Sequence, residues 1–88
     1  MPNAARKDDT NSHGNGKIIP QVTTVLINGL LASVVGDNST PDNFPHDNPK
    51  TSTGSETIII EGKPAHRKGD SRICGATTVT GSPNVLFG

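Results

Sequence analysis

The side chains best able to bind a metal are few in this chain. Its three histidines and one cysteine are His13, His46, His66 and Cys74. Three imidazoles and one thiolate make up the four ligands of a tetrahedral structural zinc site, which leaves no coordination position open for a substrate. The short spacings typical of zinc motifs, such as Cys-x-x-Cys, are absent. A site can form only if the fold brings the four residues together.

A small chain of this composition needs a stabilising element beyond its core. Its 88 residues suffice for one domain, predicted to span residues 1–88, and only 30% of them are hydrophobic and 2% aromatic. The single cysteine, Cys74, cannot close a disulfide within the chain. We therefore expect a metal, an oligomer or a docked partner to supply extra stability. A structural zinc ion can contribute on the order of 10 kcal/mol.

The net charge argues against two classes of partner. Eight Lys and Arg residues balance eight Asp and Glu residues, so we expect no positive patch of the kind that binds nucleic acid or an acidic membrane surface. No run of about 18 apolar residues is present to span a bilayer. The start of the chain, MPNAARKDDT, lacks the apolar stretch of a secretory signal peptide. Any export would then use a pathway that does not require a cleavable signal peptide.

Turn-forming residues interrupt the chain every few positions. Ten Gly and seven Pro leave no window for a long amphipathic helix. Segments 11–17 and 38–55 consist of turn-forming residues and are expected to be loops. The short apolar runs between them are rich in β-branched residues, which favours strands. These runs are Val22, 25–27, 34–35, 58–60 and 85–87. The sequence predicts an all-β domain.

An internal repeat indicates the architecture. Segment 24–37, TVLINGLLASVVGD, aligns without gaps to segment 57–70, TIIIEGKPAHRKGD, at an offset of 33, with five of fourteen positions identical. Each copy combines a strand, a glycine turn, a second strand and a Gly-Asp stop. This pattern predicts a hairpin-like arm.

A third copy appears when the two ends of the chain are read together. Residues 4–9 match 65–70 at an offset of 61, and residues 83–88 match 57–62 at an offset of 26. Three equivalent arms would close around an approximate threefold axis, which removes exposed strand edges and gives one chain the symmetry to meet a trimer. The arms are predicted at about residues 20–37, at 54–70, and split between 79–88 and 2–9.

The repeat relates two of the possible metal ligands to each other. His13 follows Asp9 by four residues, and Cys74 follows Asp70 by four residues. Asp9 and Asp70 end equivalent arms, so the two ligands should arrive at the same end of the threefold axis.

The other two histidines are related to that position less directly. His46 lies nine residues after Asp37, which ends the central arm, in a loop long enough to reach the same end of the axis. His66 lies on the arm that precedes Cys74. We predict that His13, His46, His66 and Cys74 together bind one structural zinc ion.

Residues 62–70, Gly-Lys-Pro-Ala-His-Arg-Lys-Gly-Asp, resemble the proline-alanine-alanine-arginine signature, with His66 in place of the second alanine. Together with the Ala-Ala-Arg of residues 4–6, they make the chain similar to PAAR-repeat proteins along nearly its whole length. Some positions depart from that pattern. Asn3 stands where Pro is usual and Asp8 where Gly is usual, and residues 31–34, Leu-Ala-Ser-Val, lack both the Pro and the Arg.

This resemblance implies a small pseudo-threefold cone of short strands and hairpins with a zinc ion near its vertex. Its base would sit on the blunt end of a trimeric β-helical spike, one copy per trimer. Such proteins cap the puncturing device of bacterial type VI secretion systems and of contractile phage tails. We therefore expect the protein to be a structural tip and not an enzyme. The tip would contact the target membrane only during puncture. The implied location is the bacterial cytoplasm before assembly, then delivery with the spike or a place at a virion tail tip.

Two other functions remain open. One is an adaptor that docks a separate effector onto the spike, since longer relatives carry toxin domains. The other is a small metal-dependent hydrolase. It would need an open coordination position on the metal, and four protein ligands would leave none.

The weaker sequence signals have ordinary explanations. Residues 14–17, Gly-Asn-Gly-Lys, lack the spacing of a phosphate-binding loop, and no residue is placed to orient His13 as a general base.

Overall fold

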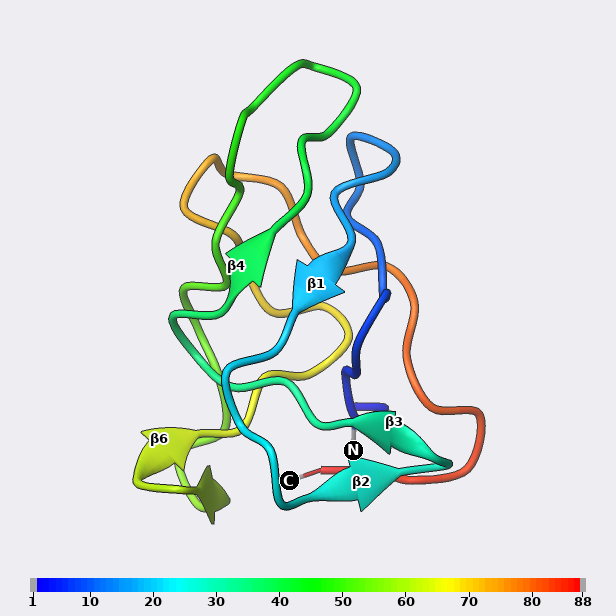
Figure 1. The fold of residues 1–88 in the computed structure, drawn as a ribbon, viewed down its shortest axis with the longest axis vertical. Helices are drawn as coiled ribbons and strands as arrows, with labels where there is room; N and C mark the ends of the chain where they lie inside the picture. Colours follow the sequence, from blue (N-terminus) through cyan, green and yellow to red (C-terminus); the bar gives the residue numbers. More distant parts are fainter. Residues whose placement is uncertain (1, 88) are drawn as a thin grey trace.

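The computed structural model describes residues 2–87 and confirms the all-β prediction for them. Residues 1 and 88 of the predicted domain lie outside the described part. The strands are short and pair antiparallel as β1 with β4, β2 with β3, and β5 with β6 (Figure 1). Their bounds are β1 Ile18–Ile19, β2 Leu26–Ile27, β3 Leu30–Leu31, β4 Asn38–Ser39, β5 Ile59–Ile60 and β6 Lys63–Pro64. Residues 2–87 include no helix that could cross a membrane.

Three backbone segments meet in a closed ring of hydrogen bonds. The amide of Ala5 donates to the carbonyl of His66 (3.2 Å), the amide of His66 to Ser33 (3.0 Å), and the amide of Ser33 back to Ala5 (3.1 Å). The three residues occupy the same position in the repeat, so the ring is cyclic and has pseudo-threefold symmetry. Isolated bridges flank it in the same cyclic order: Ala4 with Arg67, Arg6 with Ala32, and Val34 with Ala65.

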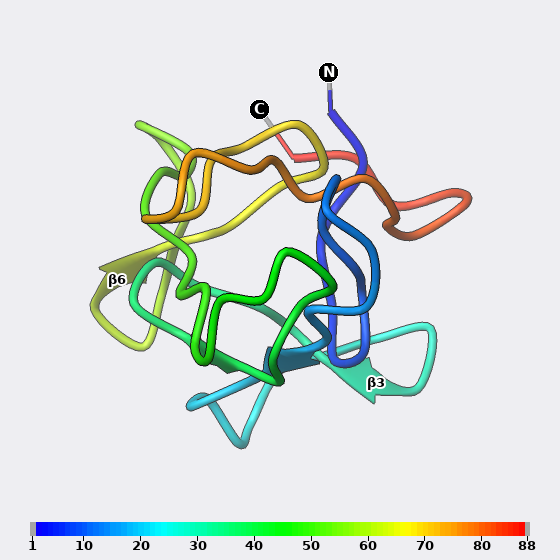
Figure 2. The ribbon, with the colours of Figure 1, turned by 90° about the horizontal axis from the view of Figure 1, so that it is seen from above.

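Two arms project hairpins outward from the ring (Figure 2). The β2–β3 hairpin turns at Asn28 and Gly29, with φ of 54° and 82°, and the β5–β6 hairpin turns at Glu61 and Gly62, with φ of 50° and 82°. Two consecutive residues with positive φ are what a two-residue type I′ turn requires. Glycine at the second position accepts this backbone without strain.

The two ends of the described chain lie together and form the third arm. Asn3 bridges Leu86 in antiparallel fashion. One residue further out, the amide of Phe87 donates to the carbonyl of Pro2 at 2.8 Å. Both ends of the described chain therefore lie at the same hairpin-like edge.

The register of the C-terminal segment differs by one residue from the sequence alignment. The amide of Ala4 donates to the carbonyl of Val85 (2.8 Å), as the amide of Ala65 donates to that of Ile58 (2.9 Å). Val85 is thus the counterpart of Ile58, whereas the alignment paired it with Ile59. A slip of one residue exchanges the two faces of a strand. The alignment could not detect this slip because residues 85–87, like residues 58–60, are all apolar.

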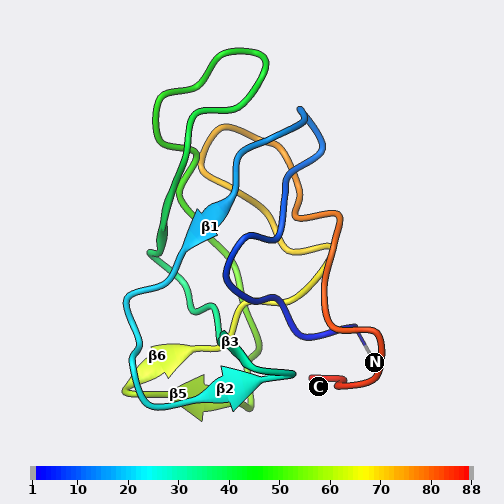
Figure 3. The ribbon, with the colours of Figure 1, turned by 45° about the vertical axis from the view of Figure 1, so that its right-hand side comes forward.

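The hydrophobic core lies between the ring and the hairpins. Ala4, Ala32 and Ala65 occupy equivalent positions where the arms approach one another, and each is 0% exposed. Ile27 and Ile60 pack in the same cluster, with the partly buried Phe87 at the third equivalent position. The molecule measures 30 × 24 × 21 Å. Strands β2, β5 and β6 and both ends of the described chain lie at one end of its long axis, and loops form the other end (Figure 3).

Candidate metal centre

Three loops gather at the apex, the end opposite the hairpins (Figure 3). Each carries one predicted ligand: His13 in loop 10–17, His46 in loop 40–49 and Cys74 in loop 72–78. One ligand atom of each of these residues, together with a carboxylate oxygen of Asp42, lies within 4.8 Å of the others. The structure therefore brings three of the four predicted ligands close enough to bind one metal ion.

His13 and Cys74 owe their placement to equivalent turns. The amide of Gly14 donates to the carbonyl of Asn11 (3.1 Å), and the amide of Gly75 donates to that of Arg72 (3.0 Å). The two glycines have φ of 86° and 89°, a backbone conformation that other residues rarely adopt. Each turn presents the residue before its glycine at the apex, so the equivalence inferred from the repeat holds in the fold.

The two apex histidines face each other through the same ring atom. Nδ1 of His13 lies 3.3 Å from Nδ1 of His46. Two nitrogen ligands of one tetrahedral metal ion, with bonds of about 2.0–2.1 Å, lie about 3.3 Å apart. The pair therefore already has the separation that a shared tetrahedral ion imposes.

The carboxylate of Asp42 completes the group and is buried beside the two rings. Its Oδ2 lies 3.2 Å from Nδ1 of His13 and 2.9 Å from Nδ1 of His46. Its Oδ1 accepts the backbone amides of Phe44 (3.0 Å) and His46 (2.7 Å). Asp42 thus shapes the loop with one oxygen and presents the other to the imidazoles.

Asp42 is held in its anionic form. Burial alone would raise the pKa of this carboxyl, but hydrogen bonds from the ring and amide of His46, the amide of Phe44 and the side chain of Asn11 outweigh that effect. The pKa of Asp42 consequently lies well below its usual value. An anionic oxygen, two imidazoles and a thiol are a donor set that fits a divalent transition metal.

Phe44 fixes the orientation of the histidine rings. Its ring stacks on His13, with centroids 4.1 Å apart and planes 16° from parallel, and lies 5.5 Å from the ring of His46. Phe44 is itself 70% exposed. It therefore covers the histidine pair on the outer side of the apex and restricts rotation of both rings.

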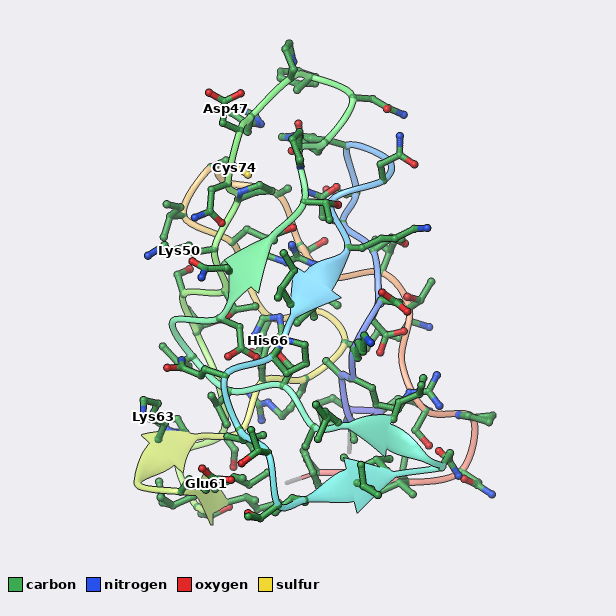
Figure 4. All side chains as sticks on the ribbon, viewed as in Figure 1. Asp47, Lys50, Glu61, Lys63, His66 and Cys74 are labelled. Carbon is green, nitrogen blue, oxygen red and sulfur yellow. The ribbon has the colours of Figure 1, made fainter. Side chains whose placement is uncertain are left out.

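The fourth predicted ligand, His66, lies away from this group, near the middle of the molecule (Figure 4). It is 0% exposed. Its Nδ1 lies 2.7 Å from the carbonyl oxygen of Thr53, and its Nε2 lies 2.6 Å from the hydroxyl of Thr78. Both ring nitrogens are thus engaged in hydrogen bonds inside the fold. The backbone explains the placement, since the amide and carbonyl of His66 belong to the central ring.

Asp42 was not predicted as a ligand, because the long loop is rich in turn-forming residues. An aspartate in such a loop ordinarily accepts hydrogen bonds from turn amides. A usable signal was present, since Asp42 precedes His46 by four residues. An aspartate at this spacing can accept the histidine amide and meet its ring, as it does here. Only the path of the loop shows that it also reaches His13.

Two comparisons with known proteins bear on this arrangement. The family model described as PAAR motif matches residues 7–80, a range that includes all four apex residues and His66. The chain is also 34% identical over 76 residues to Double-stranded DNA deaminase toxin A of Burkholderia cenocepacia (strain H111). That match covers 86% of this chain but 5% of the toxin, so the chain spans a small part of the length of this relative.

Proposed function

The chain belongs to the PAAR motif family, and from this membership we propose that it forms the tip of the trimeric β-helical spike of a type VI secretion system. The observation that carries the proposal is the cyclic ring of Ala5, Ser33 and His66, in which one chain reproduces threefold symmetry. A pseudo-threefold base can offer each subunit of a trimer a similar contact. One copy would then bind one spike trimer.

The base offers a fitting contact surface. Leu26, Ile59 and Leu86 occupy equivalent positions on the three arms and are 62%, 57% and 49% exposed. Each directly precedes a residue that packs in or against the core, namely Ile27, Ile60 or Phe87, so the alternation of a strand turns it outward. Three equivalent exposed aliphatic side chains, one per spike subunit, would be covered in the complex.

Co-elution with a trimeric β-helix fragment of the cognate spike tests this contact. Ile59→Asp and Leu26→Asp should each weaken binding at least tenfold, because a charge would be buried against an apolar surface. Ile19→Asp is the matched control, since Ile19 is 49% exposed but lies in β1, outside the hairpins. Equal loss of binding in the control, or a mass that corresponds to three chains per trimer, would contradict the proposed base contact.

We further propose that the apex binds a structural zinc ion through His13, His46 and Cys74, with Asp42 as the fourth ligand. His66 was predicted for that role, but its hydrogen bonds to Thr53 and Thr78 favour Asp42. Bound zinc would join the three apex loops and stiffen the point of the cone. Force along the spike axis would then act on a small rigid tip.

This function requires no turnover, so we propose that the chain acts as a structural protein and not as an enzyme. We propose that the protein resides in the bacterial cytoplasm until assembly and is then delivered with the spike. A tail tip of a contractile phage is the other setting in which the same geometry would serve. Contact with the target membrane would occur only during puncture, and no nucleic acid partner is proposed.

A second candidate is an adaptor that carries an effector on the spike. The observation that favours it is the match to a toxin, because this chain matches only 5% of the length of that toxin. Pro2 and Phe87, the ends of the described chain, lie side by side on the third arm, so a cargo attached at either end would sit away from the apex. A pull-down separates the two candidates, because a stable complex with another protein in the absence of spike supports the adaptor, and binding to the spike alone supports the tip.

A further inference from the structure

Arg72 is a buried charged residue for which the proposed function gives no reason. It lies two residues before Cys74 and is 1% exposed. None of the ion pairs among residues 2–87 includes it. A guanidinium cannot lose its proton in a protein, and its burial is costly unless its N–H groups find acceptors. Its acceptors therefore indicate what it does.

Four of its hydrogen bonds hold the ends of two apex loops. Nη1 donates to the carbonyl of Gly16 (3.1 Å) and Nη2 to that of Asp9 (3.4 Å), at the two ends of the loop that carries His13. The hydroxyl of Ser39 (3.2 Å) and the carbonyl of Pro49 (3.1 Å), at the two ends of the loop that carries Asp42 and His46, also accept from Nη1, so its two N–H groups are shared among three acceptors.

The third apex loop begins at Arg72 itself and carries Cys74. Nε of Arg72 donates to the hydroxyl of Thr78 (2.8 Å), at the other end of this loop. One planar side chain therefore contacts both ends of every loop that supplies a ligand atom. Such a fork of five N–H donors is a property of arginine that lysine lacks.

The repeat shows that this arrangement departs from threefold symmetry. Asn11, Ser39 and Arg72 each lie two residues after the aspartate that ends an arm, and each is buried. Only one of the three positions holds an arginine. Ser39 accepts a hydrogen bond from Arg72, and Asn11 donates to Oδ2 of Asp42 at 2.9 Å. The three equivalent residues thus form a layer between the central ring and the ligands.

We propose that Arg72 is a positioning residue of the apex metal centre, which sets the mutual placement of the three ligand-bearing loops before any metal binds. This inference rests on the proposed metal site. The fixed positive charge of Arg72 also favours an anionic ligand nearby, such as the carboxylate of Asp42. The charge of Arg72 therefore agrees with a carboxylate as the fourth ligand.

Arg72→Lys tests the proposal, because it keeps the charge and removes the fork. Zinc affinity, measured by competition with a chromogenic chelator, should fall about 10–100-fold, the range found when partners that orient metal ligands are lost. The absorption spectrum of the Co²⁺-loaded variant should shift as the ligand geometry loosens. Arg67→Lys is the matched control, because Arg67 forms an ion pair with Asp70 on its own arm. The control should leave affinity and spectrum unchanged.

A merely structural role predicts a different result, in which Arg72→Lys lowers the melting temperature but the folded variant binds zinc as tightly as wild type, with the same Co²⁺ spectrum. That result would overturn the inference. If Arg72→Lys does not fold, Ser39→Ala provides the test, because it removes one hydrogen-bond acceptor of Arg72. The zinc affinity of Ser39→Ala should fall severalfold. An unchanged affinity would overturn the inference.

Failure of the metal site itself is distinguishable from failure of this inference. If wild type binds neither Zn²⁺ nor Co²⁺, the proposed site is wrong. The positioning role is then tested in the metal-free protein by hydrogen exchange of the His46 amide, which Asp42 protects. Faster exchange in Ser39→Ala supports the role of Arg72, and unchanged exchange rejects it.

Discussion

Nε2 of His66 lies 2.6 Å from the hydroxyl oxygen of Thr78, and Nε of Arg72 donates to that same oxygen. On the other side of the ring, Nδ1 faces the carbonyl oxygen of Thr53, which can only accept. Nδ1 therefore carries the proton of the neutral ring, and Nε2 accepts from Thr78. A second proton on His66 would leave the Thr78 hydroxyl without this acceptor and place two cations in contact with it.

This network predicts a pH dependence of stability. Burial lowers the pKa of His66, so the folded state binds a proton less readily than the unfolded state. The contribution of His66 to stability is complete above the unfolded pKa of about 6.5 and is lost as the pH falls below it. Thermal unfolding of metal-free protein between pH 8 and pH 5 measures this effect. His66→Gln should flatten the decline, and parallel curves for the two proteins would contradict the assignment.

Cys74→Ser should lower zinc content and melting temperature together. Serine is a poor ligand for zinc, so the three apex loops lose their common bond. A stability loss of a few kcal/mol corresponds to a decrease of about 10 °C or more for a domain of this size. Metal analysis with differential scanning calorimetry checks both quantities. A variant that retains stoichiometric zinc would count against the site, and chelation of wild type should reproduce the thermal effect.

Asp42→Asn separates the two candidates for the fourth ligand. The amide oxygen of asparagine can still accept the amides of Phe44 and His46, so the loop should keep its shape. The anionic oxygen is lost, and zinc affinity should fall at least tenfold. His66→Gln should instead leave zinc affinity near that of wild type. The opposite ranking of the two variants in a chelator competition would restore His66 as the ligand.

Gly62→Ala tests the hairpin turn without filling any space. No atom lies within 4 Å of the position where its Cβ would be, and its φ is +82°. The cost is therefore conformational, about 1–2 kcal/mol. Chemical denaturation should show this loss, whereas Lys63→Ala, at the exposed residue next to it in β6, should change stability by less than about 0.5 kcal/mol. Equal stabilities for the two variants would show that the turn relaxes.

The internal repeat of the sequence predicts most of the architecture of this protein. Gly29 and Gly62, at equivalent places in segments 24–37 and 57–70, mark two-residue turns between short apolar strands, and such turns form hairpins through local backbone preference. The matches at the two chain ends likewise predicted that the third arm is split. The equivalence of His13 and Cys74 followed from the same alignment. These features are local, or are copied from arm to arm, and therefore show in the residue order.

Other features depended on contacts across the threefold axis, which no spacing in the chain encodes. The pairing of Val85 with Ala4 fixes a register that a run of apolar residues leaves ambiguous. Asp42 lies with His13, His46 and Cys74 at the apex, and His66 does not, because the path of one loop and the backbone ring decide which polar atoms face each other. Arg72 reaches the ends of all three apex loops for the same reason. The sequence thus determined the arms and the family, and the tertiary structure decided which side chains meet, because hydrogen bonds and coordination depend on distances of a few ångströms between residues far apart in the chain.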